Sequence, residues 1–523
     1  MHGGTITHCP RTAGPRSANP LNVDLYLGSS FGLRSFRYGE GSRLGGRMVE
    51  ETEGRGVGLP IPEAELRCGN PRAEAILLPP QPRSAFGQPR GLLYIAGTEV
   101  WDRISFHGMQ ALLVLYMVEQ LLLPGHIEHI AGFSGLRTAI QAVTGPLSTQ
   151  ALASQIFGLY VGLVYFTPVF GGLLGDRFLG RTRSVVLGGV LMAMGHFCMA
   201  FDKSFLPALL FLILGAGCLR GNLAPQLGEL YASADRRRNT GFQIYGSAVN
   251  LGAFIAPLVT GALGQAYGWH SGFAFAGFGM LFGLVVYLSG RRDLPPEREH
   301  TPGEVLQPLA RGDLKRVFFL IAIVPVAALF WIAQSQVWNT YNLWVRDHIV
   351  LRYGGWTMPV PWLQSLDGLA PFLTLPPLLL FWRWQAKRGT EPDEFTKMAI
   401  GCFLFAASTL WLAGAQFVGG AGGRAPLLWA VAFHLGSNVG WLYFSPTAIA
   451  LFSRVAPRSV NATMMGVYYL SIFLGSTISG RLGGLYETLT AAQFWSLHAA
   501  LVGLGGVAML VLGVWMRRAL GPT

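Results

Sequence analysis

The sequence predicts an all-α membrane protein with twelve transmembrane helices. Charged residues make up 13% of the 523 residues, whereas soluble proteins usually carry roughly 25%. Apolar runs near the length of about 20 residues that crosses a bilayer recur along the chain. The 69 glycines also suit helices that pack closely in lipid. These observations argue against a large soluble protein with an apolar core.

Each expected helix corresponds to one apolar segment. The twelve segments are 92–123, 150–174, 184–201, 205–231, 241–265, 269–289, 317–345, 361–383, 397–418, 426–452, 460–485 and 493–516.

The basic residues predict the orientation of these helices. If the N-terminus lies inside, the inner loops hold Arg177, Arg181, Arg183, Arg236, Arg237, Arg238, Arg291, Arg292, Arg298, Arg311, Lys315, Arg316, Lys387, Arg388, Arg454, Arg458, Arg517 and Arg518. The outer loops then hold little beyond Arg137, Lys203, Arg346, Arg352 and Arg424. This bias predicts that both termini are cytoplasmic. It also explains the net charge of +12 without a nucleic-acid partner.

Composition divides the chain into four parts. Residues 1–90 are rich in Gly, Pro and Arg and lack a membrane-spanning run. We expect them to be disordered or to be a mis-assigned extension, with Met48 as a candidate start. A charged, proline-bearing linker at 290–316 separates the helices of residues 91–289 from those of residues 317–523. The chain is thus expected to have two six-helix halves.

The sequence shows no sign of an enzyme, a metal site or a cofactor. The five cysteines, Cys9, Cys68, Cys198, Cys218 and Cys402, have no metal-binding spacing and suggest no disulfide framework. No nucleophile–base motif is evident. We expect the cysteines to serve as small apolar residues.

Ionisable residues in the first helix demand a function, because a charge within a bilayer costs at least ~2.5–3.5 kcal/mol. Glu99, Asp102 and Arg103 lie three or four positions apart, so they share one helix face and can converge on one cavity. The alternative is a charge cluster in the headgroup zone, although apolar residues flank it on both sides. His107 follows, and we interpret it as a hydrogen-bonded packing residue rather than a titrating one.

Several motifs resemble a known transporter family. Residues 165–184 read YFTPVFGGLLGDRFLGRTRS, and residues 241–254 read GFQIYGSAVNLGAF. Trp-His-Ser-Gly-Phe at 269–273 and Trp-Leu-Gln-Ser at 362–365 follow in order. Together they resemble the major facilitator superfamily and, within it, the proton-dependent oligopeptide transporter family, from about Gly91 to the C-terminus.

The resemblance implies a fold and a function. It implies a major facilitator fold with a substrate site near the midplane between the halves. It also implies a monomeric symporter of the inner (plasma) membrane, which imports di- or tripeptides with protons by rocker-switch alternating access.

The family pattern carries over well in the first half. The family's Glu-x-x-Glu-Arg is Glu99-Val-Trp-Asp102-Arg103 here, and the lysine of helix four is replaced by Arg220. Arginine stays protonated, so Glu99 and Asp102 are the candidate proton sites, with Arg103 as their partner in proton coupling. Arg103 and Arg220 would hold a substrate carboxylate. The alternative for Arg220 is a purely structural partner of the helix-one acids.

Two further residues of the first half match cavity positions of the family. These are Tyr165 on helix two and Asn250 on helix five. Where the family has a Phe-Tyr pair on helix five, this chain has Tyr245-Gly246, and the lost ring would enlarge the pocket.

The second half departs from the pattern. The family's helix-ten glutamate, which holds the peptide amino group, is replaced by Trp441. On helix seven, the family often has an acid before the glutamine, whereas this chain has Ser335 before Gln336. Helix eight, however, carries Asp367 where the family has asparagine. We infer that the negative charge moved from helix ten to helix eight, where Asp367 would bind an amino group; the alternative is an Asp that serves helix packing. His196 and His434 match no motif and are expected to be packing residues.

The Gly-Asp-Arg-x-x-Gly-Arg turn carries Asp176, Arg177 and Arg181. The resemblance implies a conformational latch there, which pairs with a neighbouring helix. A simple topology signal is the alternative.

Two other functions remain open. One is a proton-coupled symporter of another small carboxylate or anionic metabolite. The other is a non-transporting receptor on the same fold.

Overall fold

The helices predicted from the apolar runs are present. The computed structural model describes residues 87–232, 235–297, 311–418, 424–457 and 460–520. Residues 1–86, including Met48, lie outside the described residues, and so do residues 298–310 of the predicted linker. The helices all belong to the unit Pro60–Thr523.

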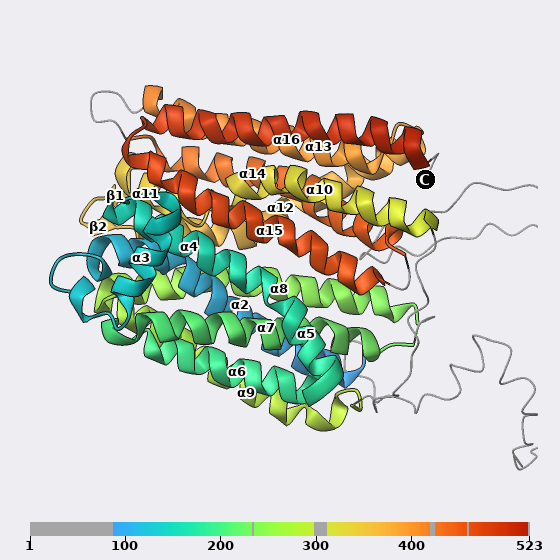
Figure 1. Cartoon of the computed structure of the whole chain (residues 1–523), viewed down its shortest axis with the longest axis horizontal. Coiled ribbons are helices and arrows are strands. Elements are labelled where there is room, and N and C mark those ends of the chain that lie inside the picture. The colour runs from blue at the N-terminus through green and yellow to red at the C-terminus, as the bar shows by residue number, and fades with distance from the viewer. Residues whose placement is uncertain (1–86, 233–234, 298–310, 419–423, 458–459, 521–523) are drawn as a thin grey trace, which may run out of the picture. The chain divides into compact units, whose positions relative to one another are not determined.

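The first half is built from helices that cover the first six predicted segments (Figure 1). They are α2 (Arg90–Tyr116), α4 (Thr149–Phe166), α5 (Pro168–Leu174), α6 (Arg181–Cys198), α7 (Phe205–Glu229), α8 (Arg237–Tyr267) and α9 (Trp269–Ser289). Helix α2 packs on α8 and α9, and α6 packs on α7 and α9. Pro168 at the first position of α5 separates it from α4, because proline donates no backbone hydrogen bond.

The second half covers the other six segments. Its helices are α10 (Arg311–Gln336), α11 (Thr340–His348), α12 (Ser365–Lys387), α13 (Glu394–Val418), α14 (Leu427–Val455), α15 (Asn461–Gly483) and α16 (Ala491–Leu520). Helix α13 packs on α14 and α16, and α10 packs on α15 and α16. Helix α10 begins at Arg311, inside the predicted linker, with Asp313 in its first turn. A carboxylate there suits the positive end of the helix dipole.

The predicted fold class is confirmed. The described part contains eight helices that are long and apolar enough to cross a membrane. Helix α2 is not among them, since it carries Glu99, Asp102 and Arg103 within its length. Those charges lower its hydropathy without removing it from the bundle, where all three contact other helices.

Two small elements were not predicted. Helix α3 (Phe133–Thr144) and a hairpin of β1 (Arg352–Tyr353) and β2 (Trp356–Thr357) lie in connections between the long helices. Phe133 and Ile140 are the buried residues of α3. Their spacing, with Leu136 between them, is the helical signal that the sequence offered.

The two halves meet closely at one end, here called the hairpin end, which holds α3, β1 and β2 (Figure 1). Helix α4 packs on α15, and α8 packs on α12. A Cβ atom added to Gly158 would lie 2.4 Å from the carbonyl oxygen of Ser476 and 2.8 Å from the Cα atom of Gly480. Glycine therefore lets the two backbones touch.

Hydrogen bonds cross the same interface. Gln150 donates to the carbonyl of Gly483 at 3.1 Å, and Arg481 donates to the carbonyl of Thr144 at 3.1 Å. Arg346 of α11 also pairs with Glu119 at 3.0 Å. Among the described residues, the halves are thus joined at the hairpin end by hydrogen bonds to backbone carbonyls, by the hydrogen bond from Ser148 to the Glu487 carboxylate and by the ion pair of Arg346 and Glu119.

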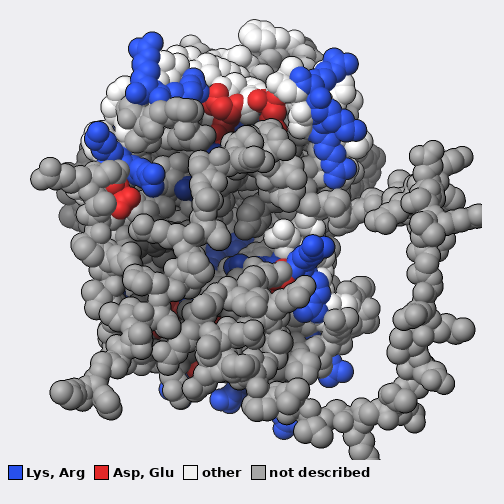
Figure 2. Space-filling model, turned by 90° about the vertical axis from the view of Figure 1, so that its right-hand side faces the viewer, with Lys and Arg blue, Asp and Glu red and all other residues white. Residues whose placement is uncertain are grey.

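The opposite end, here called the basic end, holds the C-terminal end of α16 and most of the lysines and arginines of the described residues. Figure 2 looks onto this end and shows blue side chains around its margin, with few red ones. This distribution agrees with the charge bias expected from the sequence.

Candidate substrate cavity

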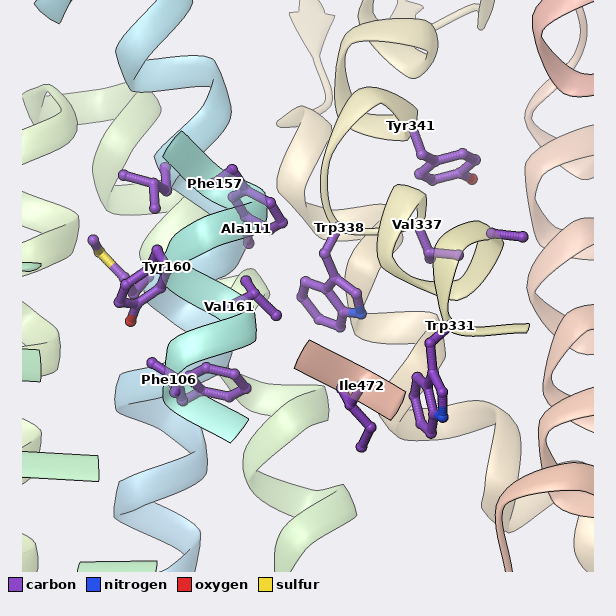
Figure 3. Close-up of a cluster of buried hydrophobic side chains, with 14 of the residues drawn as sticks. Phe106, Ala111, Phe157, Tyr160, Val161, Trp331, Val337, Trp338, Tyr341 and Ile472 are labelled. Carbon is purple, nitrogen blue, oxygen red and sulfur yellow. The ribbon is translucent and has the colours of Figure 1, made fainter. Parts of the chain in front are cut away.

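A cavity of about 250 Å³ lies between the two halves. Both halves contribute to its wall: Arg103, His107, Gln110, Phe157, Val161, Tyr165, Val249, Asn250 and Ala253 come from the first, and Trp331, Gln334, Ser335, Trp338, Asp367, Pro371, Ser437, Asn438, Trp441, Ser445, Ile449, Tyr468, Tyr469, Ile472 and Ser476 from the second. Figure 3 shows Val161 of the first half facing Trp338 of the second, with Phe157 and Ile472 nearby.

One wall is centred on Arg103. Its Nε lies 2.6 Å from Oε1 of Glu99, one helical turn earlier, and 3.6 Å from Oδ2 of Asp102. The hydroxyl of Tyr245 on α8 donates to the other oxygen of Glu99 at 2.6 Å. Glu99 therefore has a cation on one oxygen and a phenol on the other, although its side chain is fully buried.

Asp102 is held by the second arginine. Nε and Nη2 of Arg220 on α7 donate to its two oxygens at 2.9 and 3.2 Å. This fork geometry is available to arginine and not to lysine. The guanidinium also lies 4.1 Å from the centre of the Phe106 ring. Nη1 of Arg220 is buried with no hydrogen-bond partner among the described residues.

The cluster differs in one respect from the expectation that all three helix-one residues converge on a cavity. Arg103 lines the cavity, but Glu99, Asp102 and Arg220 do not. The two carboxylates lie outside the cavity wall, because their oxygens accept hydrogen bonds from Arg103, Arg220 and Tyr245. The predicted contact between Arg220 and a helix-one acid is present. Arg220 reaches a ligand in the cavity only if that pairing changes.

The opposite wall holds Asp367, which the structure places with an unexpected partner. Nδ1 of His434 on α14 lies 2.6 Å from Oδ1 of Asp367 on α12. The interpretation of His434 as a packing residue is therefore wrong in part, since its ring is fully buried but bonded to a cavity acid. These residues are 67 positions apart, so no local sequence pattern could pair them.

The other predicted cavity residues also lie in the wall. Tyr165, Asn250 and Trp441 all line it. The amide of Asn250 donates to the carbonyl of Gly246 at 3.1 Å. A Cβ atom at Gly246 would meet nothing within 4 Å, but Gly246 is not one of the residues that line the cavity, so the expected enlargement stays a prediction. The sequence assigns no role to Tyr245, whereas the structure shows that it donates to Glu99.

His107 also lines the cavity. Its ring lies 4.9 Å from that of Trp338, and its Nδ1 is buried without a hydrogen-bond partner among the described residues. The ring is hydrogen-bonded to Gln110, as expected of His107, but it lies at the cavity wall and not within the helix packing. His196, in contrast, lies outside the cavity wall and is hydrogen-bonded to Ser105.

The predicted latch residues gather at the basic end, away from the cavity. Arg181 pairs with Asp176 at 2.8 Å and with Glu229, at the end of α7, at 2.7 Å. Arg177 is exposed. Glu297 accepts from the backbone N–H groups of Arg181 and Thr182 at 2.9 Å each, and so caps the start of α6. The cap needs Gly180, whose φ is +81° and where a Cβ atom would lie 2.5 Å from the Glu297 carboxylate.

No group of three or more His, Cys, Asp or Glu side chains in the described ranges is arranged to hold a metal ion. The cavity wall itself carries a cation of the first half, Arg103, and a carboxylate of the second, Asp367. Such a cavity suits a ligand with charges of both signs.

Comparison with known proteins identifies the family of the chain. Residues 122–480 match the Major Facilitator Superfamily. The chain is 28% identical to a di-/tripeptide transporter of Lactococcus lactis subsp. cremoris, over 82% of this chain and 96% of that protein. It is 27% identical to a peptide transporter of Yersinia enterocolitica subsp. palearctica, over 85% of this chain and 98% of the relative.

Solved structures give the same result. The crystal structure of a peptide transporter POT in complex with sulfate superposes with a TM-score of 0.73 at 25% identity, covering 86% of this chain and 99% of that one. A complex of a mutant peptide transporter POT with alafosfalin gives a TM-score of 0.71 at 25% identity, over 84% and 97% of the two chains. These proteins are transporters and not enzymes, which agrees with the prediction from the sequence.

Proposed function

Because the chain belongs to the Major Facilitator Superfamily and, within it, to the proton-dependent oligopeptide transporter family, we propose that it imports di- or tripeptides, or peptide-like molecules, with protons. The observation that carries the proposal is the pair of opposite charges on one cavity. Arg103 and Asp367 line it from different halves. A zwitterionic peptide presents a carboxylate and an ammonium group, so each terminus has a counter-charge in a different half.

The two ends of the ligand would then connect the halves. Arg103 would hold the carboxylate and Asp367 the ammonium group, while Tyr165, Asn250 and Trp441 would form the wall around the peptide. A ligand held in this way draws the halves together, which is the basis of alternating access about a midplane site. Closure around a bound ligand would thus depend on both of its charges.

Protons would bind to Glu99 and Asp102, the two acids that contact Arg103. Glu99 and Asp102 are buried acids that hold Arg103 and Arg220. Protonation of either acid would remove its hold on the arginine, since a neutral carboxyl attracts a cation only weakly. The freed arginine could turn to the ligand carboxylate, and the Nη1 atom of Arg220 has no partner to lose. Protonation would in this way bias the conformational equilibrium.

We further propose that the protein works as a monomer in the inner membrane, with the basic end and both termini in the cytoplasm. The Lys and Arg side chains at the basic end support this orientation. The closed hairpin end would then face outward. Arg181, Asp176 and Glu229, with Arg177 nearby, would act as the latch that breaks or forms as the bundle rocks.

The first test concerns the cargo. In proteoliposomes loaded with unlabelled ligand, we expect counterflow of a labelled dipeptide, and we expect the free dipeptide to compete better than its N-acetyl form, which carries no amine charge. Anionic metabolites without an amine should compete weakly. Equal competition by both dipeptide forms would favour a symporter of another small carboxylate, a reading that Trp441 in place of an acid supports. Binding without flux would favour a receptor.

The second test concerns the driving ion. Uptake should rise with an inward proton gradient and collapse when a protonophore is added, because the cluster behind Arg103 consists of carboxylates that accept protons. Replacing sodium by potassium at constant pH should have little effect. Undiminished uptake after collapse of the gradient, with an absolute need for sodium, would contradict proton coupling.

A further inference from the structure

The pair of Asp367 and His434 gives the far wall of the cavity a feature that the proposed function does not use. His434 lies on α14 and Asp367 on α12, so the hydrogen bond between them joins two helices that both border the cavity. The imidazole itself is fully buried, whereas the carboxylate is 18% exposed. The acid faces the cavity and the histidine stands behind it.

Recognition of an ammonium group requires Asp367 as a carboxylate, and a carboxylate can only accept hydrogen bonds. In that state Nδ1 of His434 carries the hydrogen and donates it to Oδ1. No hydrogen bond from another described residue reaches Oδ2 of Asp367, and the other ring nitrogen of His434 is buried with no described partner. The bond therefore fixes one oxygen of the carboxylate and leaves the other available.

The surroundings of His434 hold the ring in place. The Tyr341 ring stands edge-on at 5.1 Å, and the neighbouring Phe433 ring lies at 5.3 Å. Arg454 of α14 and Glu394 of α13 lie at the basic end, where they pair with each other at 2.8 Å. Among the described residues, Asp367 is the charged side chain that contacts His434.

We propose that His434 is a positioning residue for recognition of the ligand's amino group. By donating to Oδ1, it would fix the rotamer of Asp367 and direct Oδ2 into the cavity, towards a primary ammonium. This inference rests on the proposed function, because it needs a ligand with a free amine. Selectivity for that amine then depends on the pair of Asp367 and His434 and not on the carboxylate alone.

The test is a comparison of His434→Phe with His434→Asn. Phenylalanine keeps a ring of similar size but removes the donor. Asparagine places an amide nitrogen at the position of Nδ1, so it can restore the hydrogen bond. The readout is the ratio of affinities for a dipeptide and for its N-acetyl form, measured by competition on the full-length purified protein. His498→Phe is the matched control, since His498 is buried in the same half, bonded to Gln336 and the Phe494 carbonyl, and does not line the cavity.

We expect His434→Phe to reduce the ratio by about tenfold or more, the value of one hydrogen bond to a charged group. His434→Asn should recover most of it, and His498→Phe should leave it unchanged. In an Asp367→Asn background, His434→Phe should have no further effect on the ratio, because a positioning residue acts only through its partner.

Two outcomes separate the inference from its premise. If the wild type itself binds both forms equally, the amine site fails and so does this part of the proposed function. If the wild type discriminates but His434→Phe discriminates equally well, or if its effect is the same with and without Asp367, only the role of His434 is refuted. Loss of the fold would instead lower the affinities for both dipeptide forms together, in His434→Phe and in His434→Asn alike.

Discussion

Glu99→Gln should abolish accumulation of substrate against its gradient while leaving counterflow intact. Glutamine keeps the shape of the side chain and can still hydrogen-bond to Tyr245, but it cannot exchange a proton. Arg103 would lose the negative charge that lies 2.6 Å from its Nε and would resemble the state in which Glu99 is protonated. Counterflow needs only binding and conformational change, so it should persist, whereas coupling to the proton gradient should be lost.

The measurement compares gradient-driven uptake with counterflow in the same proteoliposomes. Glu128→Gln serves as the control, because Glu128 is an exposed carboxylate in the connection after α2. It should accumulate substrate as the wild type does. Concentrative uptake by Glu99→Gln at the wild-type level would exclude Glu99 as the coupling site and leave Asp102 as the candidate.

Asp367→Asn should weaken binding of a free-amine ligand by about two orders of magnitude or more. Removing one partner of a buried ion pair costs ~3–5 kcal/mol, since the surviving charge is left uncompensated, and ~1.4 kcal/mol is a factor of ten. Asparagine can still accept a hydrogen bond from His434, so the wall should keep its shape. Affinity for the N-acetyl ligand should change little.

A second substitution tests where the charge must stand. Trp441 also lines the cavity, so Asp367→Asn combined with Trp441→Glu should recover part of the lost affinity by placing an acid on α14. Competition by the dipeptide and its N-acetyl form is the readout for both variants. Equal loss of the two forms in Asp367→Asn would mean that Asp367 supports the wall and does not bind an amine.

Much of the fold was open to prediction from sequence, for physical reasons. A segment that spans lipid must be long, apolar and helical, so each of the twelve apolar runs corresponds to helix in the structure. Helix α3 is amphipathic and short, and its signal rests on Phe133, Leu136 and Ile140 alone. The sequence does not indicate the start of α10 at Arg311, because the first turn of this helix is charged and resembles the preceding linker.

The site was partly predictable. Charges within apolar segments drew attention to Arg103 and Asp367, and both line the cavity. What the sequence could not give was the direction of each side chain. Glu99 and Asp102 share a helix face with Arg103, but which of them meets the cavity depends on Tyr245 and Arg220, 146 and 118 positions from their partners. The contact of His434 with Asp367, 67 positions away, could not be predicted for the same reason.

The glycine contact between α4 and α15 has a consequence for the energetics of the transport cycle. Where Gly158 meets Gly480, no side chains interdigitate, so closing this seam immobilises no rotamers there. Side chains that become ordered at an interface can each cost up to about 1.5–2 kcal/mol of conformational entropy. The Gly158–Gly480 contact therefore opens and closes without that cost, unlike the contacts of Gln150 and Arg481 at the same interface. The populations of the two states then follow small differences in how each binds protons and cargo, and a modest differential affinity is enough to drive the exchange.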